Sequence, residues 1–259
     1  MLNSDREQRL VFGEVAQQYH RLRPGYPAAL FDALQSYAGL RPGSRVLEIG
    51  AGTGKATAPM LGRGWRVVAL EPDPQMARVA LAMVGGLGEV ELLESTFEAW
   101  SEPPDHFATV FAAQSWHWVD PALRFAKAHR VLRPGGALAL VWNRPNGGDP
   151  RLRQKLDEVY HEHAPGITGG PPGERQGDRR QEIARAGGFG QVEVVEVPWE
   201  TSYSAVDYAE LMRTQSDHRM LAPERLALLL AKIQEVIEAA GGSYRVGYQG
   251  LLYLARALP

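Results

Sequence analysis

The sequence predicts an α/β fold: a doubly wound, mostly parallel seven-stranded sheet with an antiparallel last strand, N-terminal helices, and a helical cap inserted before the last strand. Short apolar runs alternate with helical stretches up to about residue 145, which is typical of a parallel sheet with helices on both faces. One of these runs ends in an acid followed by three glycines at alternate positions. A β-rich run also follows the last two helical stretches, and it favours an antiparallel return.

The elements are expected in the following order. An amphipathic helix over 6–20, with Phe12 and Tyr19 on one face, precedes a break at 23–27 and a helix over 27–38. Strands are expected at 45–49, 66–70, 90–94, 107–113, 136–142, 192–198 and 244–256. Helices are expected at 54–63, 74–84, 121–131, 151–164, 179–186, 206–217 and 223–240, and loops at 143–148 and 165–178.

The glycines after the first core strand indicate a ligand-binding turn. Glycine tolerates positive φ, so Gly50 can end the strand in a tight turn. Gly52 lets the backbone lie flat against a ligand, and Gly54 is expected to let the next helix pack closely on the strand. The third glycine of the dinucleotide fingerprint would stand at Lys55, and no Gly-Lys-Ser/Thr follows, so neither that fingerprint nor a nucleoside triphosphate loop is present. A glycine triplet alone is a weak signal.

A second acid strengthens the interpretation. Glu71 ends the next strand, where a carboxylate can accept hydrogen bonds from both hydroxyls of a ribose. The alternative is a solvated or helix-capping acid before Pro72. Asp73 is the better candidate for the cap, because Pro74 then falls at the first helical position.

These residues together resemble a known family. Residues 48–54 (EIGAGTG), Glu71 and residues 131–136 (VLRPGG) look like the signature of class I S-adenosylmethionine-dependent methyltransferases. The segment 23–27, with Phe12 and Tyr19, is similar to the N-terminal part of a small-molecule branch that includes trans-aconitate methyltransferases. The resemblance implies S-adenosyl-L-methionine as methyl donor and S-adenosyl-L-homocysteine as product.

The resemblance also implies where the adenine and the methyl group lie. The turn after the third strand lies on the adenine in this family and usually carries an aspartate after a glycine. Ser95 and Thr96 replace that pair, so a hydroxyl or a backbone amide would have to serve. Phe97 either stacks on the adenine or belongs to the core.

The fourth strand ends in an unusual aromatic cluster. If the extended run continues, Gln114, Trp116 and Trp118 share one side, and Ser115 and His117 the other. In the family this segment lies between methyl donor and acceptor. Trp116 either contacts the sulfonium, a cation–π interaction worth ~1–2 kcal/mol when desolvated, or packs against the next helix. We expect one tryptophan to pack and one to face the pocket.

His117 is the candidate general base, because its ordinary pKa lies close to neutral pH. A carboxylate acceptor needs no base, and His117 would then orient the substrate or have a structural role. Arg23 and Tyr19 are expected to close over the donor, with Arg23 on the methionine carboxylate; the alternative for Arg23 is a surface charge. The expected donor-binding set is Tyr19, Arg23, Glu48, Gly50, Ala51, Gly52, Gly54, Glu71, Pro72, Thr96, Phe97, Ala113, Gln114 and Trp116.

Composition narrows the class of protein. The chain of 259 residues has 28 basic and 30 acidic side chains and no cysteine, so thiolate metal sites, cysteine nucleophiles and disulfides are excluded. No basic patch indicates nucleic-acid binding, no cluster has metal-ligand spacing, and no apolar run predicts a membrane span. With no signal peptide recognised in the first residues, a cytoplasmic protein that acts on a small molecule is expected. The oligomeric state stays open.

One domain over 1–259 is expected: an N-terminal segment (1–40) over the donor site, a cofactor-binding core (41–145) and a cap insertion (199–242). The insertion either shapes the acceptor pocket or packs on the sheet edge. Two rival functions remain, a non-catalytic S-adenosylmethionine-binding protein and an NAD(P)-dependent oxidoreductase. Candidates for the acceptor pocket are Tyr203, Tyr208, Met212, Arg213, His218 and Arg219.

Overall fold

The computed structural model describes residues 16–101, 104, 106–167, 179–215 and 217–259. These divide into two compact units, each described by itself. Within the described ranges, the core unit comprises residues 25–143, 176–197 and 250–259, and the helical unit comprises residues 1–24, 144–175 and 198–249. Phe12, most of the expected helix over 6–20 and most of the expected loop over 165–178 lie outside the described residues.

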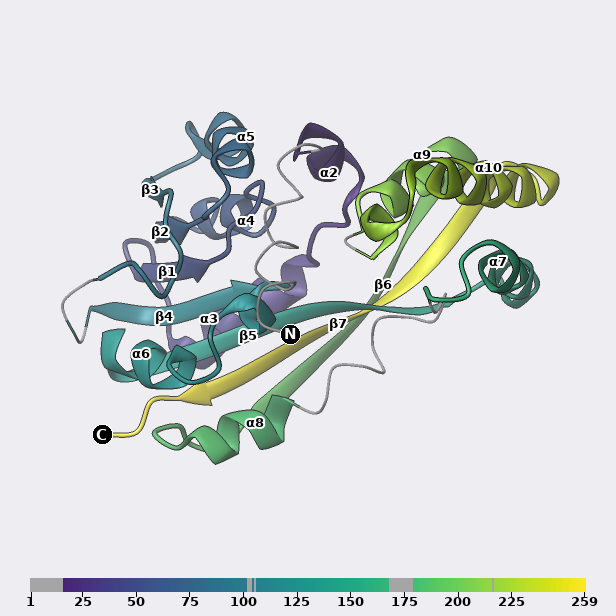
Figure 1. Ribbon diagram of the computed structural model, residues 1–259. Helices are drawn as coiled ribbons and strands as arrows, with labels where there is room; N and C mark the ends of the chain where they lie inside the picture. The colour runs from purple at the N-terminus through teal and green to yellow at the C-terminus, as the bar shows by residue number, and fades with distance from the viewer. Residues whose placement is uncertain (1–15, 102–103, 105, 168–178, 216) are drawn as a thin grey trace. The chain divides into compact units, whose positions relative to one another are not determined.

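The sheet confirms the fold class expected from the sequence. Its strands are β1 (Arg45–Ile49), β2 (Arg66–Leu70), β3 (Val90–Leu93), β4 (Phe107–Ala113), β5 (Leu132–Gly148), β6 (Glu193–Ser204) and β7 (Ser243–Arg256). They are ordered β3-β2-β1-β4-β5-β7-β6, with β7 antiparallel (Figure 1). The chain reverses its direction of winding between β1 and β4, which both pair with parallel neighbours. Doubly wound sheets bind their ligands at the carboxyl ends of the strands at such a switch point.

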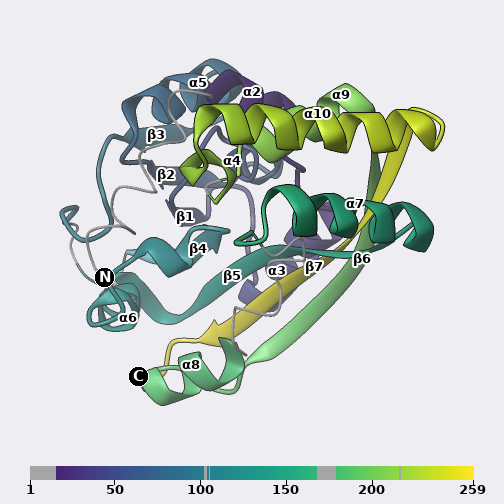
Figure 2. The same cartoon turned by 45° about the vertical axis from the view of Figure 1, so that its right-hand side comes forward.

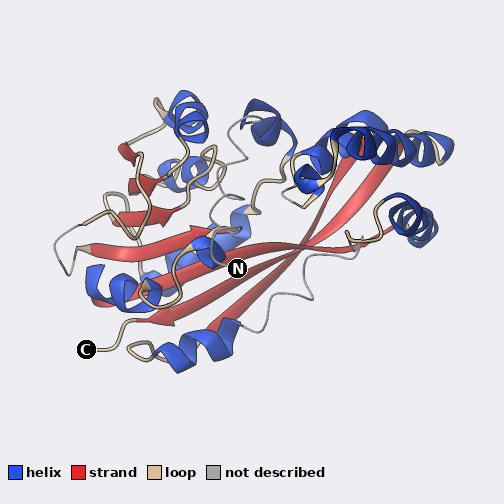
Figure 3. Ribbon diagram, in the orientation of Figure 1, coloured by secondary structure: helices blue, strands red, loops and turns tan. Residues whose placement is uncertain are grey.

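Helices of the core unit lie on both faces of this sheet. Figure 3 shows these helices in blue and the strands in red. They are α3 (Ala28–Ala38), α4 (Thr57–Leu61), α5 (Pro74–Val84), the 3-10 helix η2 (Trp116–Trp118), α6 (Arg124–Val131) and α8 (Arg179–Ala186). On one face, α3 and α4 pack over Val46 and Val67. Residues of α6 and α8 belong to a second apolar cluster together with Leu47 and Val68, and Figure 2 shows α6 beside the start of β5 and α8 at the start of β6. Adjacent residues of β1 and β2 are therefore both buried, which explains the unbroken apolar runs of these strands.

The helical unit contains α2 (Ala16–Leu22), α7 (Pro150–His163), α9 (Ala205–Arg213), the 3-10 helix η4 (His218–Met220) and α10 (Pro223–Ala239). Its apolar core joins residues of α7, α9 and α10, among them Leu156, Ala209 and Ile233. The expected helical insertion between the last two strands is present, because α9, η4 and α10 separate β6 from β7. Its role as a cap stays a prediction. Among the helices that the structure describes, none is long and apolar enough to cross a membrane.

Several expected elements were wrong in extent, among them the strand expected over 192–198, which continues as β6 to Ser204, and the helix expected over 206–217, which ends as α9 at Arg213. The helix expected over 54–63 is reduced to α4, Thr57–Leu61, because Gly54 has a φ of +82° and the chain turns through the two residues that follow. The loop expected over 143–148 is strand, since β5 continues to Gly148 beside β7. The approach there is close: a Cβ on Gly247 would lie 2.3 Å from the carbonyl oxygen of Asn146.

Candidate functional site

The glycine turn lies at the switch point, directly after β1. Gly50, Gly52 and Gly54 all have positive φ, of 69°, 60° and 82°. The amides of Gly50 and Ala51 both donate to the carbonyl of Leu70, at 2.8 and 3.0 Å, so the turn folds back over the end of β2. A Cβ on Gly50 would lie 2.5 Å from the Cβ of Ser115. Glycine is therefore required here by conformation and by space.

Gly54 has a different neighbour from the one expected. We expected it to bring the following helix close to the strand. Instead, a Cβ at this position would lie 2.9 Å from Cγ1 of Val84 and 3.5 Å from Cα of Ala80, both on α5. The third glycine thus lets the turn approach α5. Gly52 is less constrained by its surroundings, since its nearest neighbour would be Cε of Met76 at 3.7 Å.

Two carboxylates lie beside the turn. Glu48, 1% exposed, accepts a hydrogen bond of 2.6 Å from the Thr57 hydroxyl. Burial raises the pKa of Glu48 to about 8, against the opposing hydrogen bond from Thr57. Glu71, 7% exposed, accepts from the amide of Gly52 at 2.8 Å and from that of Asp73 at 3.0 Å. Its carboxylate thus connects the glycine turn to the end of β2.

Asp73 performs the capping role assigned to it from the sequence. Its side chain accepts hydrogen bonds from the amides of Gln75 and Met76, at 2.8 and 3.0 Å, and Pro74 is the first residue of α5. This confirms that Glu71 is not the cap of α5. Pro72 lies half-buried between the two acids.

The segment after β4 does not continue as a strand, so the expected alternation of its side chains was wrong. Gln114 has a φ of +58°, the only positive value among the described non-glycine residues, and η2 begins two residues later. The amide side chain of Gln114 donates to the carbonyl of Asn143 at 3.2 Å, and Ala113 next to it is half-buried. The hydroxyl of Ser115 makes a short hydrogen bond to the carbonyl of Ile49, the last residue of β1.

Of the two tryptophans, Trp116 is the one that packs. It is completely buried, and its ring meets that of Phe125 edge to face at 5.2 Å. Trp118 is half-buried and lies 4.6 Å from the ring of His117, which is exposed. The structure thus gives the Trp116 ring the packing role that the sequence left open, and its contact with a sulfonium stays an untested prediction.

In the turn after β3, the aromatic residue Phe97 also packs in the core. Phe97 is 2% exposed and stacks on Trp100, with ring centroids 6.3 Å apart. The hydroxyl of Thr96 accepts a hydrogen bond from the amide of Ala99 at 3.2 Å. Ser95 is half-buried, and its hydroxyl donates to the carbonyl of Thr96. Phe97 therefore belongs to the core, and its stacking on adenine is untested.

Tyr19 and Arg23 belong to the helical unit and are described within it. The guanidinium of Arg23 lies over the ring of Tyr19 at 4.9 Å. Its Nε donates to the Thr214 hydroxyl at 3.1 Å, and Nη2 donates to the Thr214 carbonyl at 2.8 Å. Arg23 is thus an oriented side chain rather than a loose surface charge. Its role toward a donor remains a prediction.

The candidates for the acceptor pocket have varied surroundings in the helical unit. His218 is 4% exposed, with Nε2 2.8 Å from the Tyr160 hydroxyl and Nδ1 2.8 Å from the Asp217 carboxylate. Arg213 forms an ion pair with Glu210 at 3.1 Å, and Tyr203 lies 3.5 Å from Tyr248 between hydroxyls. The remaining candidates are half-buried: Tyr208, Met212 and Arg219.

Sequence reasoning missed several residues that shape the site. Ser115 was noted only for its position, although it fills the space left by Gly50. Thr57 and Asn143 carry no motif, and Asn143 donates to the carbonyl of Gly25 at 2.7 Å. The buried Arg124 gave no signal either, because a single arginine in a helix is ordinarily exposed.

Comparison with known proteins gives this geometry a context. Residues 47–140 match the family model of the methyltransferase domain. An uncharacterized methyltransferase of Mycobacterium tuberculosis is 41% identical over 150 residues, which cover 55% of this chain and 56% of that protein. The chain thus spans little more than half the length of this curated relative.

Solved structures share the fold. A proposed type II methyltransferase from Anaeromyxobacter dehalogenans superposes with a TM-score of 0.68 at 24% identity, covering 92% of this chain and 99% of that one. Phosphoethanolamine N-methyltransferase 2 from Haemonchus contortus, in complex with phosphomonomethylethanolamine and S-adenosylhomocysteine, gives a TM-score of 0.55 at 17% identity, covering 95% of this chain and 57% of that one. At these identities the likeness concerns the fold alone.

Proposed function

We propose that the chain, whose residues 47–140 match the family model of the methyltransferase domain, is an S-adenosylmethionine-dependent methyltransferase acting on a small molecule. The acceptor would be a carboxylate or hydroxyl oxygen. Its lone pair forms the new bond to the methyl carbon while the carbon–sulfur bond breaks. The bonding pair goes to sulfur, which loses its positive charge and leaves as S-adenosylhomocysteine.

The observation that carries this proposal is the pair formed by the glycine turn and Glu71. The carboxylate of Glu71 accepts from the amide of Gly52 at 2.8 Å, so the acid at the end of β2 and the turn after β1 are joined at the switch point. This arrangement suits an adenosine, with its ribose beside the acid and the rest of the ligand along the glycine backbone.

The donor-binding roles follow from these positions. Glu71 and Pro72 would lie along the ribose, and Gly50, Ala51 and Gly52 would line the methionine side through their backbone. Thr96 and Phe97 would lie toward the adenine, and Ala113, Gln114 and Trp116 would lie near the methyl group. Glu48 and Gly54 would stabilise the conformation of the turn.

Alignment rather than proton transfer would account for most of the rate. Holding a nucleophile in line with the sulfonium methyl supplies a large part of the barrier reduction in such displacements. A carboxylate acceptor is already ionised, so His117 would orient it, and a hydroxyl acceptor would use His117 as its base. Tyr19 and Arg23 are proposed to bind the methionine end of the donor, because a guanidinium is a natural bidentate partner for a carboxylate.

The acceptor is tested by supplying the purified protein with methyl-labelled S-adenosylmethionine and three fractions of a bacterial extract: metabolites, RNA and protein. We expect label in the metabolite fraction only, and identification of the labelled product by mass spectrometry would name the substrate. Label in RNA or protein would contradict a small-molecule acceptor. Donor binding without transfer to any fraction would favour the non-catalytic rival.

A matched pair of variants connects this transfer to the proposed donor site. Glu71→Gln removes the charge that accepts from Gly52, whereas Glu94→Gln changes an exposed acid just after β3. Glu71→Gln should weaken donor binding by about tenfold or more, since a hydrogen bond to a charged group is worth about 1.5–3 kcal/mol. Glu94→Gln should bind like the wild type. Equal affinities for the two variants would remove Glu71 from the site.

A further inference from the structure

Arg124, the first residue of α6, is a charged side chain buried to 8% exposure in the core unit. Burial lowers its pKa, and the nearby Glu182 opposes that shift. A guanidinium that has lost most of its water needs several oriented acceptors, because an unpaired buried charge is strongly unfavourable. The identity of those acceptors indicates what Arg124 is for.

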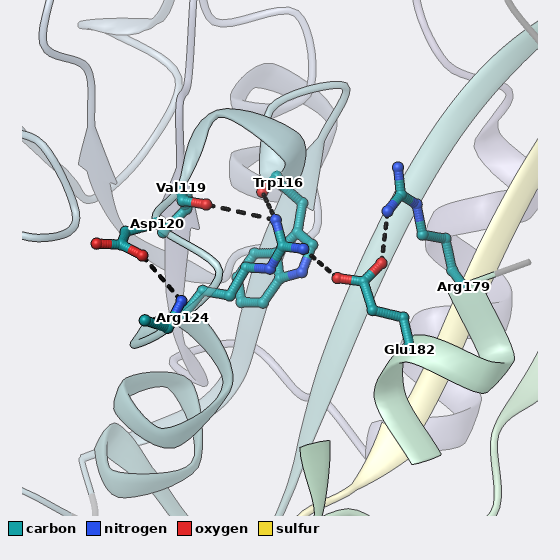
Figure 4. Close-up of polar contacts among 7 residues, drawn as sticks. Trp116, Val119, Asp120, Arg124, Arg179 and Glu182 are labelled. Carbon is teal, nitrogen blue, oxygen red and sulfur yellow. Dashed lines mark hydrogen bonds and ion pairs between the residues drawn. The ribbon is translucent and has the colours of Figure 1, made fainter. Parts of the chain in front are cut away.

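Two of the acceptors belong to the segment after β4 (Figure 4). Nη1 of Arg124 donates to the carbonyl of Trp116 at 2.9 Å and, more weakly, to that of Val119 at 3.4 Å. The guanidinium also lies 5.7 Å from the Trp116 ring. Arg124 thus contacts the first residue of η2 and the residue that follows η2, through their backbone carbonyls and the Trp116 ring.

The third acceptor is supplied by α8. Nη2 of Arg124 makes a short ion pair with the carboxylate of Glu182, whose other oxygen accepts from Arg179 at 2.5 Å. Figure 4 shows Glu182 between the two arginines. The Arg179 guanidinium lies 5.0 Å from the ring of Trp142, on β5. Glu182 therefore fixes the direction in which Arg124 presents its remaining donors to η2.

The same segment is attached at its other end to the glycine turn. The Ser115 hydroxyl donates to the carbonyl of Ile49, and Ser115 occupies the space beside Gly50. Gln114, directly before Ser115, has a φ of +58°. A residue other than glycine keeps such a conformation only where its surroundings impose it. Segment 114–119 is therefore restrained from both sides, by β1 and by Arg124.

We propose that Arg124, oriented by Glu182, is a positioning residue for methyl transfer: its hydrogen bonds to Trp116 and Val119 hold segment 114–119 against the Gly50 turn. This inference rests on the proposed function for its catalytic consequence, although the restraint itself does not. Arginine suits the role because its planar fork reaches two carbonyls and a carboxylate at once, which the single ammonium of lysine does not reproduce.

Three variants and one control separate positioning from stability. Arg124→Met removes all the contacts, and Arg124→Lys keeps a charge for Glu182 but loses the fork. Glu182→Gln keeps the fork and weakens the ion pair. Arg66→Met, the control, removes an arginine from the exposed ion pair with Glu89 elsewhere in the core unit. Each protein is measured for thermal stability, for S-adenosylhomocysteine affinity and for turnover with the labelled donor.

We expect the effects on turnover and on stability to differ among these variants. Arg124→Lys should lower turnover about tenfold or more while melting near the wild type, because a ~1 Å misplacement in a site can cost ~10²-fold. Glu182→Gln should lose more stability than turnover. Arg124→Met should lose both, and Arg66→Met neither. If Arg124→Lys loses turnover only in proportion to its loss of stability, Arg124 has a merely structural role and the proposal is overturned.

Hydrogen exchange tests the restraint without any donor. The amides of Gln114, Trp118 and Val119 have backbone partners in the wild type. Arg124→Lys should speed their exchange relative to the amides of β1, and Arg66→Met should not. Unchanged exchange in Arg124→Lys would overturn the proposal even if the enzyme is a methyltransferase. Faster exchange in a protein that fails to bind S-adenosylhomocysteine would instead overturn the proposed function.

Discussion

Gly50 is constrained both by its backbone conformation and by the space around its Cα. Its φ is +69°, and its Cα faces Ser115 so closely that a Cβ would lie 2.5 Å from the Ser115 Cβ. Ser115 is in turn held by the carbonyl of Ile49, so it has little freedom to retreat. The Gly50 turn and the segment after β4 therefore pack closely at this point, and a change in either affects the other.

Gly50→Ala should be costly for this reason. The left-handed conformation costs about 1–2 kcal/mol for an alanine, and the overlap with Ser115 adds about 1–3 kcal/mol. The control is Gly43→Ala, where φ is +86° but nothing lies within 4 Å of the new Cβ, so only the first cost applies. Urea unfolding should show the larger loss for Gly50→Ala. Equal losses for the two variants would contradict the close fit.

Glu48 should make stability depend on pH. Its pKa is raised by burial from 4.5 to about 8, so near neutral pH the folded protein keeps a proton that the unfolded chain has released. The stabilisation is fully present below about pH 4.5 and is lost as pH rises to about 8, with a slope of at most ~1.4 kcal/mol per pH unit.

Glu48→Gln tests that slope, because glutamine is uncharged throughout the range. Urea midpoints measured between about pH 5 and about pH 8 should fall less steeply for Glu48→Gln than for the wild type. Glu94→Gln, at an exposed acid, should keep the wild-type slope. An unaltered slope in Glu48→Gln would mean that this carboxyl is ionised at neutral pH in the folded state.

The role of a residue could be predicted from the sequence where the local backbone conformation requires one residue type. Gly50 could be assigned to a tight turn and Asp73 to a cap, because each is required by local geometry. The partner of Gly54 and the burial of Trp116 could not be predicted. Both depend on elements that are distant in the sequence, α5 for Gly54 and α6 for Trp116.

At the scale of elements, a buried polar contact joins two parts of the helical unit. The Tyr160 hydroxyl of α7 and Nε2 of His218 in η4 lie 2.8 Å apart, and the two residues are 6% and 4% exposed. The Asp217 carboxylate holds the other ring nitrogen of His218. The buried imidazole thus lies between a tyrosine hydroxyl and a carboxylate, each 2.8 Å from one of its ring nitrogens.

Tyr160→Phe should therefore destabilise the protein by about 1–3 kcal/mol, the cost of leaving a buried polar atom of His218 without its hydrogen-bond partner. Tyr208→Phe is the matched control in the same unit, since no hydrogen bond of its hydroxyl occurs among the described residues. Its effect should stay within about 0.5 kcal/mol, as for most neutral substitutions. Thermal melts of both variants make the comparison, and equal melting temperatures would show that the tyrosine–histidine contact contributes nothing.

Elements with a strong local pattern were predicted to the residue, among them β1, β2, α5 and α8. The errors have non-local causes. β5 extends to Gly148 because β7 lies beside it. This partner is more than 90 residues away in the chain, so the sequence of residues 143–148 alone does not indicate a strand. The helix expected at 54–63 begins only at Thr57, because Gly54 has a positive φ and belongs to the turn.

At the scale of the whole molecule, the sheet order places β1, β2 and β4 next to one another, and with them the three turns proposed to bind the donor. The winding of the sheet could be predicted from the alternation of strands and helices. The acceptor could not be, because the helical unit has no motif, and its aromatic and charged residues largely bond one another.

The most direct test of a donor site at the Gly50 turn is a calorimetric titration of S-adenosylhomocysteine into the wild-type protein. We expect saturable binding at one site per chain, and no saturable heat when NADH is titrated under the same conditions. An absence of heat with S-adenosylhomocysteine, or saturable binding of NADH in its place, would contradict a donor site at this turn.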